Sequence, residues 1–433
     1  MSRRRMLAAI ILVVALGARV GYVAATPGYV PIHDDHQYDQ LALGIVHNGD
    51  FPVDDHRPTA YRPPGYPYVL AGVYAIAGTG NDRVTIARYV QTLEGTAIVA
   101  LLGLLALWLM GPLAALCTMA VAALYIPLVT VGAALLSEPQ FAALTIAALL
   151  CVLAYRRAGG GWRWVILTGV LGGVASLTRS NGLVVLLALA GGLWIGRPRL
   201  SRRALAPVLA MLATSILVIA PWTIRNAVIF HTFIPVTDEQ GGTLAGTYNP
   251  VSASDPVAPA SWHLLAQIPE YYSRSLAVAA RPEPELQSTL TRLALRYIGN
   301  HPFYVFEVGF YNGLRLLDLG GLARVDFTAM SSGITSAGVA DSGAICFWIV
   351  GLLAIVGLAS RRVRRAIPRF VWLAAGLILV SILFVNTESP RFRVPLDPFF
   401  ILLAGGGLAT IGEALARRRA GAHQAPPEPA GQT

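Results

Sequence analysis

Long stretches without a single charged residue constrain the fold of this chain more than any other feature. Residues 112–137 and 343–360, for example, contain no Asp, Glu, Lys or Arg. About 20 apolar residues are enough to cross the hydrocarbon core of a membrane as an α-helix. Only 13% of all residues are charged, whereas a soluble protein carries about a quarter. The sequence therefore predicts an all-α polytopic membrane protein.

Ten segments are apolar enough to be candidate spans, and several of them are short. The first also resembles a signal peptide, with small residues at Ala24 and Ala25. Nine further spans favour a first helix that is retained. The ten candidates are residues 6–25, 88–110, 112–134, 139–154, 163–178, 182–196, 205–226, 343–359, 367–386 and 396–415.

The distribution of arginine predicts the orientation of the spans. All 33 basic residues are Arg, which excludes a catalytic or Schiff-base lysine. More than half of them fall in five short segments on one side of the ten spans, as the positive-inside rule requires of cytoplasmic loops. We expect a multi-pass cell-membrane protein with both termini cytoplasmic. The arginine clusters between apolar runs indicate topology rather than nucleic-acid binding.

This topology divides the chain into four parts. Residues 1–226 form an N-terminal transmembrane module that includes a first outer loop, 26–87. Residues 227–342 form a second outer cap of mixed structure, and within it 301–321 has the pattern of an amphipathic helix on the membrane surface. Residues 343–416 carry the last membrane helices, and the Pro-rich tail 417–433 is expected to be disordered.

The first outer loop carries two adjacent acids, Asp34 and Asp35. A helical pattern follows them, starting at Tyr38 and ending at Gly49, so the acids lie at a helix N-terminus. Helix capping explains one of the two acids. It does not explain the pair, which is costly beside a membrane because like charges repel.

A second motif in this loop is Tyr61-Arg62 followed by Pro63-Pro64-Gly65. The prolines stiffen the backbone, and the planar fork of Arg62 suits a phosphate. An arginine that reaches toward lipid headgroups is the alternative. The apolar run 66–78 is too short to span and is expected to be interfacial or re-entrant.

These motifs, in this order, resemble the GT-C superfamily of integral membrane glycosyltransferases. The resemblance is to the protein O-mannosyltransferase and lipid A aminoarabinose transferase branch. It implies transfer of a sugar from a polyprenyl-phosphate carrier on the outer face of the membrane. It further implies that Asp34 is the catalytic base, that Arg62 binds the carrier phosphate, and that Asp35, Tyr38 and Tyr61 lie in the same site.

Other polar residues are expected at the outer ends of the spans. The resemblance implies that Glu138 lies near the carrier phosphate and holds a divalent metal ion, which takes oxygen ligands; a helix cap is the equal alternative. Further anion contacts are expected from Arg179, Arg391 and Arg393, with lipid headgroups as the competing partner. The histidines of the first loop have no zinc-binding spacing.

We therefore expect an inverting hexosyl- or pentosyltransferase in which Asp34 takes a proton from an acceptor hydroxyl. The sugar and the acceptor, which can be a lipid, a glycan or a protein, stay open. A lipid-linked saccharide flippase or exporter is one alternative, and it predicts polar residues along the span centres. A non-catalytic scaffold of the cell envelope is the other, and it predicts that Asp34 and Arg62 point to bulk water.

Overall fold

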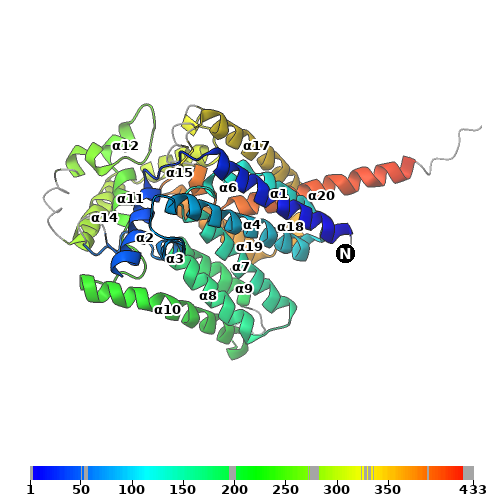
Figure 1. Ribbon diagram of the computed structural model, residues 1–433, viewed down its shortest axis with the longest axis horizontal. Helices are drawn as coiled ribbons and strands as arrows, with labels where there is room; N and C mark the ends of the chain where they lie inside the picture. Colours follow the sequence, from blue (N-terminus) through cyan, green and yellow to red (C-terminus); the bar gives the residue numbers. More distant parts are fainter. Residues whose placement is uncertain are drawn as a thin grey trace, which may run out of the picture.

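The computed structural model shows a helical protein in which a bundle of long helices carries a group of shorter helices at one end (Figure 1). It describes residues 3–49, 51–52, 57–194, 201–271, 273, 282–322, 324–325, 329, 333–334, 336–387 and 390–422. Within these residues the regular structure is helical throughout, apart from one isolated bridge between Pro52 and Pro58. The all-α prediction is confirmed.

Helices of the bundle come from both ends of the chain. They are α1 (Arg3–Ala25), α4 (Arg83–Met110), α5 (Pro112–Leu124), α6 (Ile126–Val131), α7 (Glu138–Arg157), α8 (Trp162–Thr178), α9 (Gly182–Leu193), α10 (Arg202–Phe230), α17 (Ala337–Ala359), α18 (Arg361–Ala366), α19 (Arg369–Leu383) and α20 (Asp397–Ala422).

The remaining helices belong to the two segments predicted to lie outside the membrane. They are α2 (Asp34–Asn48), α3 (Gly65–Ala77), α11 (Gln240–Thr247), α12 (Pro250–Ser254), α14 (Glu283–Asn300), α15 (Tyr304–Leu316) and the short 3₁₀ helix η2 (Leu265–Gln267). A second 3₁₀ helix, η3 (Pro390–Arg393), precedes α20. In its described part, the cap 227–342 consists of helices joined by loops.

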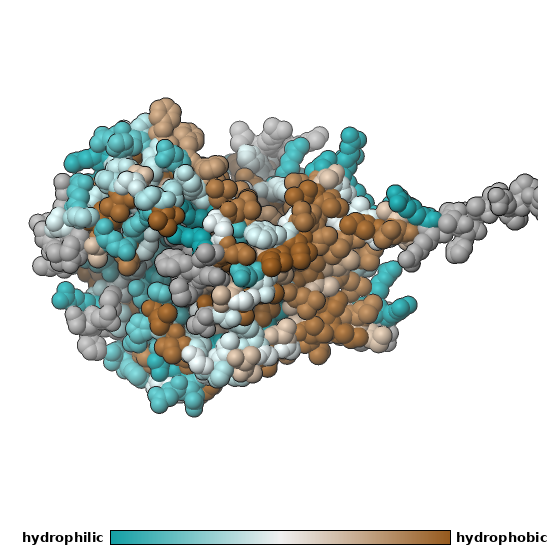
Figure 2. Space-filling view, turned by 90° about the horizontal axis from the view of Figure 1, so that it is seen from above, coloured by the Kyte–Doolittle hydropathy of each residue, from teal (hydrophilic) through white to brown (hydrophobic). Residues whose placement is uncertain are grey.

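Six described helices are long and apolar enough to cross a membrane: α1, α4, α7, α10, α17 and α20. Five shorter apolar helices, α3, α5, α8, α9 and α19, accompany them. The chain is thus a multi-pass membrane protein, while the predicted count of ten spans is not confirmed. The start of α1 and the end of α20 lie at one end of the bundle, and α2, α11, α12 and α14 lie at the other (Figure 1). Apolar side chains cover the bundle between these polar ends (Figure 2).

The predicted span 112–134 is interrupted, and Pro127 explains the break. A helical Pro127 would lack the N–H that binds the carbonyl of Ala123, and its ring would clash with that carbonyl. The chain ends α5 at Leu124 and starts α6 after an extended Tyr125. The carbonyl groups freed by the break accept hydrogen bonds from the buried Arg19 of α1, at 3.4 Å for Ala123 and 3.3 Å for Ala122.

Two helices predicted from the sequence pattern are confirmed. Helix α2 begins at Asp34 and ends where Gly49 adopts a left-handed φ of 68°, as a glycine C-cap does. Helix α15 lies within the predicted segment 301–321, buries Tyr304 and Val308, and exposes Phe306 and Phe310. Its place on the membrane surface stays a prediction. At the C-terminus, α20 continues to Ala422, into the segment assigned to the tail. Residues 423–433 lie outside the described residues.

Candidate functional site

Asp34 is the centre of a cluster of charged side chains at the capped end of the bundle. One carboxylate oxygen accepts from Arg62 and the other from Arg391, so that the loop 26–87 meets the segment before α20. The side chain of Asp34 is 25% exposed, whereas those of Arg62 and Arg391 are 14% and 8% exposed. Two of the residues that the sequence predicted as anion contacts thus share one carboxylate.

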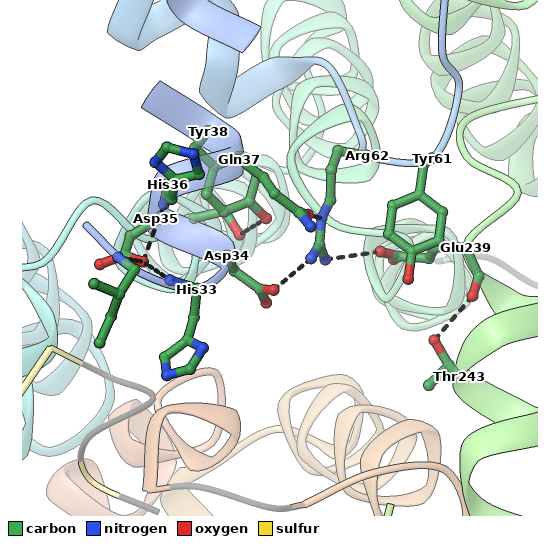
Figure 3. Close-up of polar contacts among 12 residues, drawn as sticks. His33, Asp34, Asp35, His36, Gln37, Tyr38, Tyr61, Arg62, Glu239 and Thr243 are labelled. Carbon is green, nitrogen blue, oxygen red and sulfur yellow. Dashed lines mark hydrogen bonds and ion pairs between the residues drawn. The ribbon is translucent and has the colours of Figure 1, made fainter. Parts of the chain in front are cut away.

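Arg62 has further partners that fix its guanidinium (Figure 3). Its Nε donates to Gln37 Oε1 at 2.8 Å, and its Nη1 lies 3.3 Å from Glu239 Oε2. The rings of Tyr38 and Tyr61 lie 5.7 Å and 5.1 Å from the guanidinium carbon, within cation–π range. The first loop and the cap therefore hold this arginine from several sides.

The two arginines set the charge of Asp34. Burial alone would raise the pKa of this carboxyl, but the guanidinium groups of Arg391 and Arg62 outweigh it and hold the pKa well below its ordinary value. Burial also raises the pKa of the Tyr61 phenol to about 12, so that this hydroxyl is protonated at neutral pH. Asp34 is an ionised carboxylate in the absence of substrate.

Glu138 forms a second ion pair next to the first. Its Oε1 lies 2.7 Å from Arg179 Nη1 and 3.8 Å from Arg391 Nε. Ser137 connects this ion pair to Tyr38, which lies beside Arg62. The hydroxyl of Ser137 is 3.1 Å from both Arg179 Nη1 and the hydroxyl of Tyr38. The cluster therefore extends from Glu239 through Asp34 to Glu138.

Several side-chain atoms of Glu138, Arg179 and Arg391 are buried and have no hydrogen-bond partner among the described residues. They are Glu138 Oε2, Arg179 Nε, and Arg391 Nε and Nη1. Buried polar groups are almost always hydrogen-bonded in native proteins. Unsatisfied guanidinium donors at one place are typical of a site that receives an anion.

Asp35 has a different environment from Asp34, although the two are adjacent. It is 2% exposed, and its Oδ1 accepts the backbone N–H groups of Ile32, His33 and His36 at 3.1, 2.8 and 3.0 Å. Its Oδ2 accepts the hydroxyl of Tyr29. The geometry makes Asp35 the anchor of the α2 N-terminus and leaves Asp34 to face the arginines (Figure 3).

Arg393, which the sequence grouped with Arg391, points away from the cluster. It is buried between Asp318 and Asp397, with N–O distances of 2.6 and 3.2 Å, and lies over the ring of Phe347 at 3.6 Å. Because η3 has three residues per turn, side chains two positions apart leave it in different directions. The structure thus gives Arg393 an internal ion pair instead of a place in the site.

Replacing Arg393 with Met is expected to destabilise the protein by about 3–5 kcal/mol, because it leaves two buried carboxylates without their partner. Thermal unfolding in detergent measures this. The control is Arg417→Met, since the Arg417 side chain is 78% exposed and exposed pairs contribute little. Equal melting temperatures for the Arg393 and Arg417 variants would contradict this role.

The donor set around Glu138 does not fit the divalent metal ion that the resemblance implied. Asp34, Glu138 and Glu239 each pair with an arginine, and three guanidinium groups repel a cation at this distance. Within the part of the chain that the structure describes, no three His, Cys, Asp or Glu side chains are grouped to hold a metal. Asp54, Asp55, His56 and Glu388 lie outside that part.

Glu239 is a member of the cluster that the sequence did not predict. It lies in the cap, far along the chain from the first loop, and no spacing pattern marks it. Its neighbour Asp238 packs against the same loop, since the backbone N–H of Asp238 donates to the carbonyl of Ala60 at 3.2 Å. Glu283, at the start of α14, accepts from Thr59 Oγ1 at 2.6 Å and from the Ala60 N–H at 2.7 Å.

This contact between loop and cap is expected to depend on pH. Burial and the nearby Glu283 raise the pKa of Asp238 to about 7, from an ordinary value of 3.8. A carboxyl whose pKa is raised on folding stabilises below its ordinary pKa, and the stabilisation is lost as pH rises through the raised value. The melting temperature should fall between about pH 4 and 7, and less so in Asp238→Asn. If the melting temperature falls equally with pH in the wild type and in Asp238→Asn, titration of Asp238 is not the cause.

Comparison with known proteins finds one family that matches part of the chain and solved structures with a similar fold. Residues 61–224, less than half of the chain, match the family described as dolichyl-phosphate-mannose-protein mannosyltransferase. No curated protein matches the chain. The oligosaccharyltransferase AglB from Archaeoglobus fulgidus, solved with an inhibitory peptide and a dolichol-phosphate, matches with a TM-score of 0.55 and 13% identity over 99% of this chain and 52% of that one.

Two more structures match. The apo form of the Archaeoglobus fulgidus oligosaccharyltransferase gives a TM-score of 0.56 at 13% identity, over 96% of this chain and 51% of that one. ArnT from Cupriavidus metallidurans, bound to undecaprenyl phosphate, gives 16% identity over 95% and 77% of the two chains, but its TM-score of 0.40 is too low for a comparison of folds.

The chain spans about half the length of the oligosaccharyltransferase that it matches. Within that half, the likeness at low identity is one of fold. The family match over residues 61–224 and this likeness in fold agree with the resemblance to GT-C membrane glycosyltransferases that was drawn from the sequence.

Proposed function

We propose that the protein transfers a sugar from a polyprenyl-phosphate carrier to an acceptor hydroxyl. Asp34 is the general base, and Arg62 and Arg391 bind the carrier phosphate. The observation that carries the proposal is the meeting of Arg62 and Arg391 on the single carboxylate of Asp34, at the polar end of an apolar helical bundle. Such a place suits a ligand with a charged head and a long apolar chain.

A phosphate can compete with Asp34 for the two arginines. The guanidinium fork binds a phosphate with two parallel hydrogen bonds, and Arg391 already has free donors at Nε and Nη1. Arg179 extends the same positive surface, while Tyr38 and Tyr61 border Arg62. In this proposal Asp34 forms ion pairs with Arg62 and Arg391 until the carrier phosphate binds to them.

Binding of the carrier also prepares the base. When the arginines turn to the phosphate, the burial of Asp34 is less opposed, and the pKa of the carboxyl rises toward that of an effective base. Asp34 then takes the proton of the acceptor hydroxyl as its oxygen attacks the anomeric carbon. The bond between that carbon and the phosphate oxygen breaks, and the carrier phosphate leaves with the electron pair.

Arg62 and Arg391 stabilise the negative charge that grows on the leaving phosphate. The acceptor attacks from the face opposite the leaving group, and the configuration of the sugar inverts. In this proposal the guanidinium groups supply the positive charge that the leaving phosphate requires, and no step is assigned to a metal ion.

The proposed location is the outer face of the cell membrane. In support, the arginine-rich segments predict that the start of α1 and the end of α20 lie on the cytoplasmic side. The cluster lies at the opposite end of the bundle (Figure 1). The module 1–226 would supply Asp34, Arg62, Glu138 and Arg179. The cap 227–342 would supply Glu239 and a wall for the acceptor, and the C-terminal helices would position Arg391.

Release of free polyprenyl phosphate tests this function. Purified protein in vesicles is given polyprenyl-phosphate sugars, hexoses and pentoses in turn, together with a panel of lipid, glycan and peptide acceptors. Acceptor-dependent release of the carrier phosphate is expected. Movement of an intact lipid-linked sugar between the leaflets, without its cleavage, would support a flippase instead. Absence of both activities would favour a scaffold.

A further inference from the structure

Tyr29, in the segment between α1 and α2, connects two parts of the chain that meet at the site. Its hydroxyl donates to Asp35 Oδ2, and it accepts the backbone N–H of Leu135 at 3.2 Å. Asp35 adjoins Asp34, and Leu135 lies three residues before Glu138. One phenol group therefore joins the start of α2 to the segment that leads into α7.

Arg88 of α4 supports this tyrosine from below its ring. The guanidinium lies 4.4 Å from the ring centroid, and Arg88 is 2% exposed. It donates to the carbonyl of Thr26 at 2.8 Å, to Thr26 Oγ1 at 2.6 Å and to the carbonyl of Ala133 at 2.7 Å. Arg88 thus ties together the same two segments that the tyrosine hydroxyl joins.

Burial and the neighbouring Asp35 raise the pKa of Tyr29 well above its ordinary value, which keeps the hydroxyl protonated as a donor. The ring also lies close to Gly333, where an added Cβ would be 2.5 Å from Cε2. Arg88 and Gly333 both lie against the ring, so the hydroxyl has little freedom to move away from its two partners.

We infer that Tyr29 is a positioning residue that fixes the distance between Asp34 and Glu138. This role rests on the proposed function, since the distance matters for catalysis only if Asp34 and Arg391 act on the same substrate. Arg391 contacts both Asp34 and Glu138. If the two segments shifted relative to one another, Glu138 and the Arg391 that it contacts would move away from Asp34. The base and its phosphate-binding arginine would both remain, but at the wrong distance from each other.

The test is Tyr29→Phe, which removes the hydroxyl and keeps the ring next to Arg88 and Gly333. Without this hydrogen bond the two segments can shift relative to one another, so kcat should fall about tenfold, whereas KM for the carrier should change by less than about twofold. Amide hydrogen exchange should become faster in both residues 29–36 and 133–138. The control is Tyr304→Phe, which removes a hydroxyl bonded to the carbonyl of Thr247 in the cap.

Faster exchange in both segments with a loss confined to kcat supports the positioning role. Unchanged exchange in 133–138, or a loss in KM with kcat intact, would overturn it. If the wild-type protein cleaves no lipid-linked sugar, the proposed function fails, and the exchange experiment alone decides whether Tyr29 joins the two segments.

Discussion

Replacing Asp34 with Asn is expected to lower kcat for sugar transfer by about 10³-fold, the scale of a lost general base. The amide has the size of the carboxyl group and cannot take the proton of the acceptor. It also removes the negative charge that competes with the carrier phosphate for Arg62 and Arg391. Carrier binding should therefore be retained or tighter, and the two effects are measured separately by release and by binding of labelled carrier.

Asp82→Asn is the matched control, because Asp82 is an exposed acid at the start of α4, outside the cluster. It should transfer sugar at the wild-type rate. An Asp34→Asn protein that is folded and equally active would remove Asp34 from the chemistry. Asp35 could not simply replace it, since four donors already occupy its oxygens.

Replacing Arg62 with Met is expected to lower kcat/KM by about 10²-fold or more, because the leaving phosphate loses a preorganised cation. The Met side chain keeps the apolar contacts with the two neighbouring tyrosines, Tyr38 and Tyr61. The loss should appear in both KM and kcat, since the arginine contacts the phosphate in the bound and in the transition state. Initial rates over a range of carrier concentrations measure it.

Arg62→Lys separates charge from geometry. It keeps the positive charge but not the planar fork, and its activity should lie between those of wild type and Arg62→Met. A Met variant with normal kcat/KM would show that the carrier phosphate lies elsewhere. A Lys variant as poor as Met would assign the whole effect to the fork and its contacts with Gln37 and Glu239.

Much of the fold could be predicted because membrane helices depend on local composition. The charge-free runs predicted the polytopic class, and the pattern from Tyr38 to Gly49 predicted α2 with its glycine stop. The break at Tyr125 was missed, although Pro127 carries a local signal for it. Helices α9 and α19 are a few residues shorter than the spans 182–196 and 367–386 predicted for them, because an apolar run does not mark the residue at which a helix begins or ends.

The site was predictable where its residues carry a local motif or lie at the end of a predicted span, as Glu138, Arg179 and Arg391 do. Asp34 and Arg62 stand out through the acidic pair and the Pro-Pro that follows the arginine, and the structure brings them together. The spacing of the acidic pair did not by itself tell Asp34 from Asp35, and only the family resemblance pointed to Asp34. The structure separates the two because the backbone amides of residues 32, 33 and 36 enclose the carboxyl of Asp35. Glu239 and Tyr29 carry no local signal, because only the fold brings them to Arg62 and Leu135.

Arg391 and Arg393 show the same limit. Their spacing in the sequence suggested a shared role, yet one faces Asp34 and the other is buried with Asp318 and Asp397. A 3₁₀ turn separates their directions, and the sequence pattern did not predict that turn.

The most direct test of the central claim is an experimental structure of the protein with bound polyprenyl phosphate. The account predicts phosphate oxygens within about 3 Å of the guanidinium groups of Arg62 and Arg391, with Asp34 released from at least one of them and its carboxylate facing the cap. A phosphate bound elsewhere on the bundle, with both ion pairs of Asp34 intact, would contradict it.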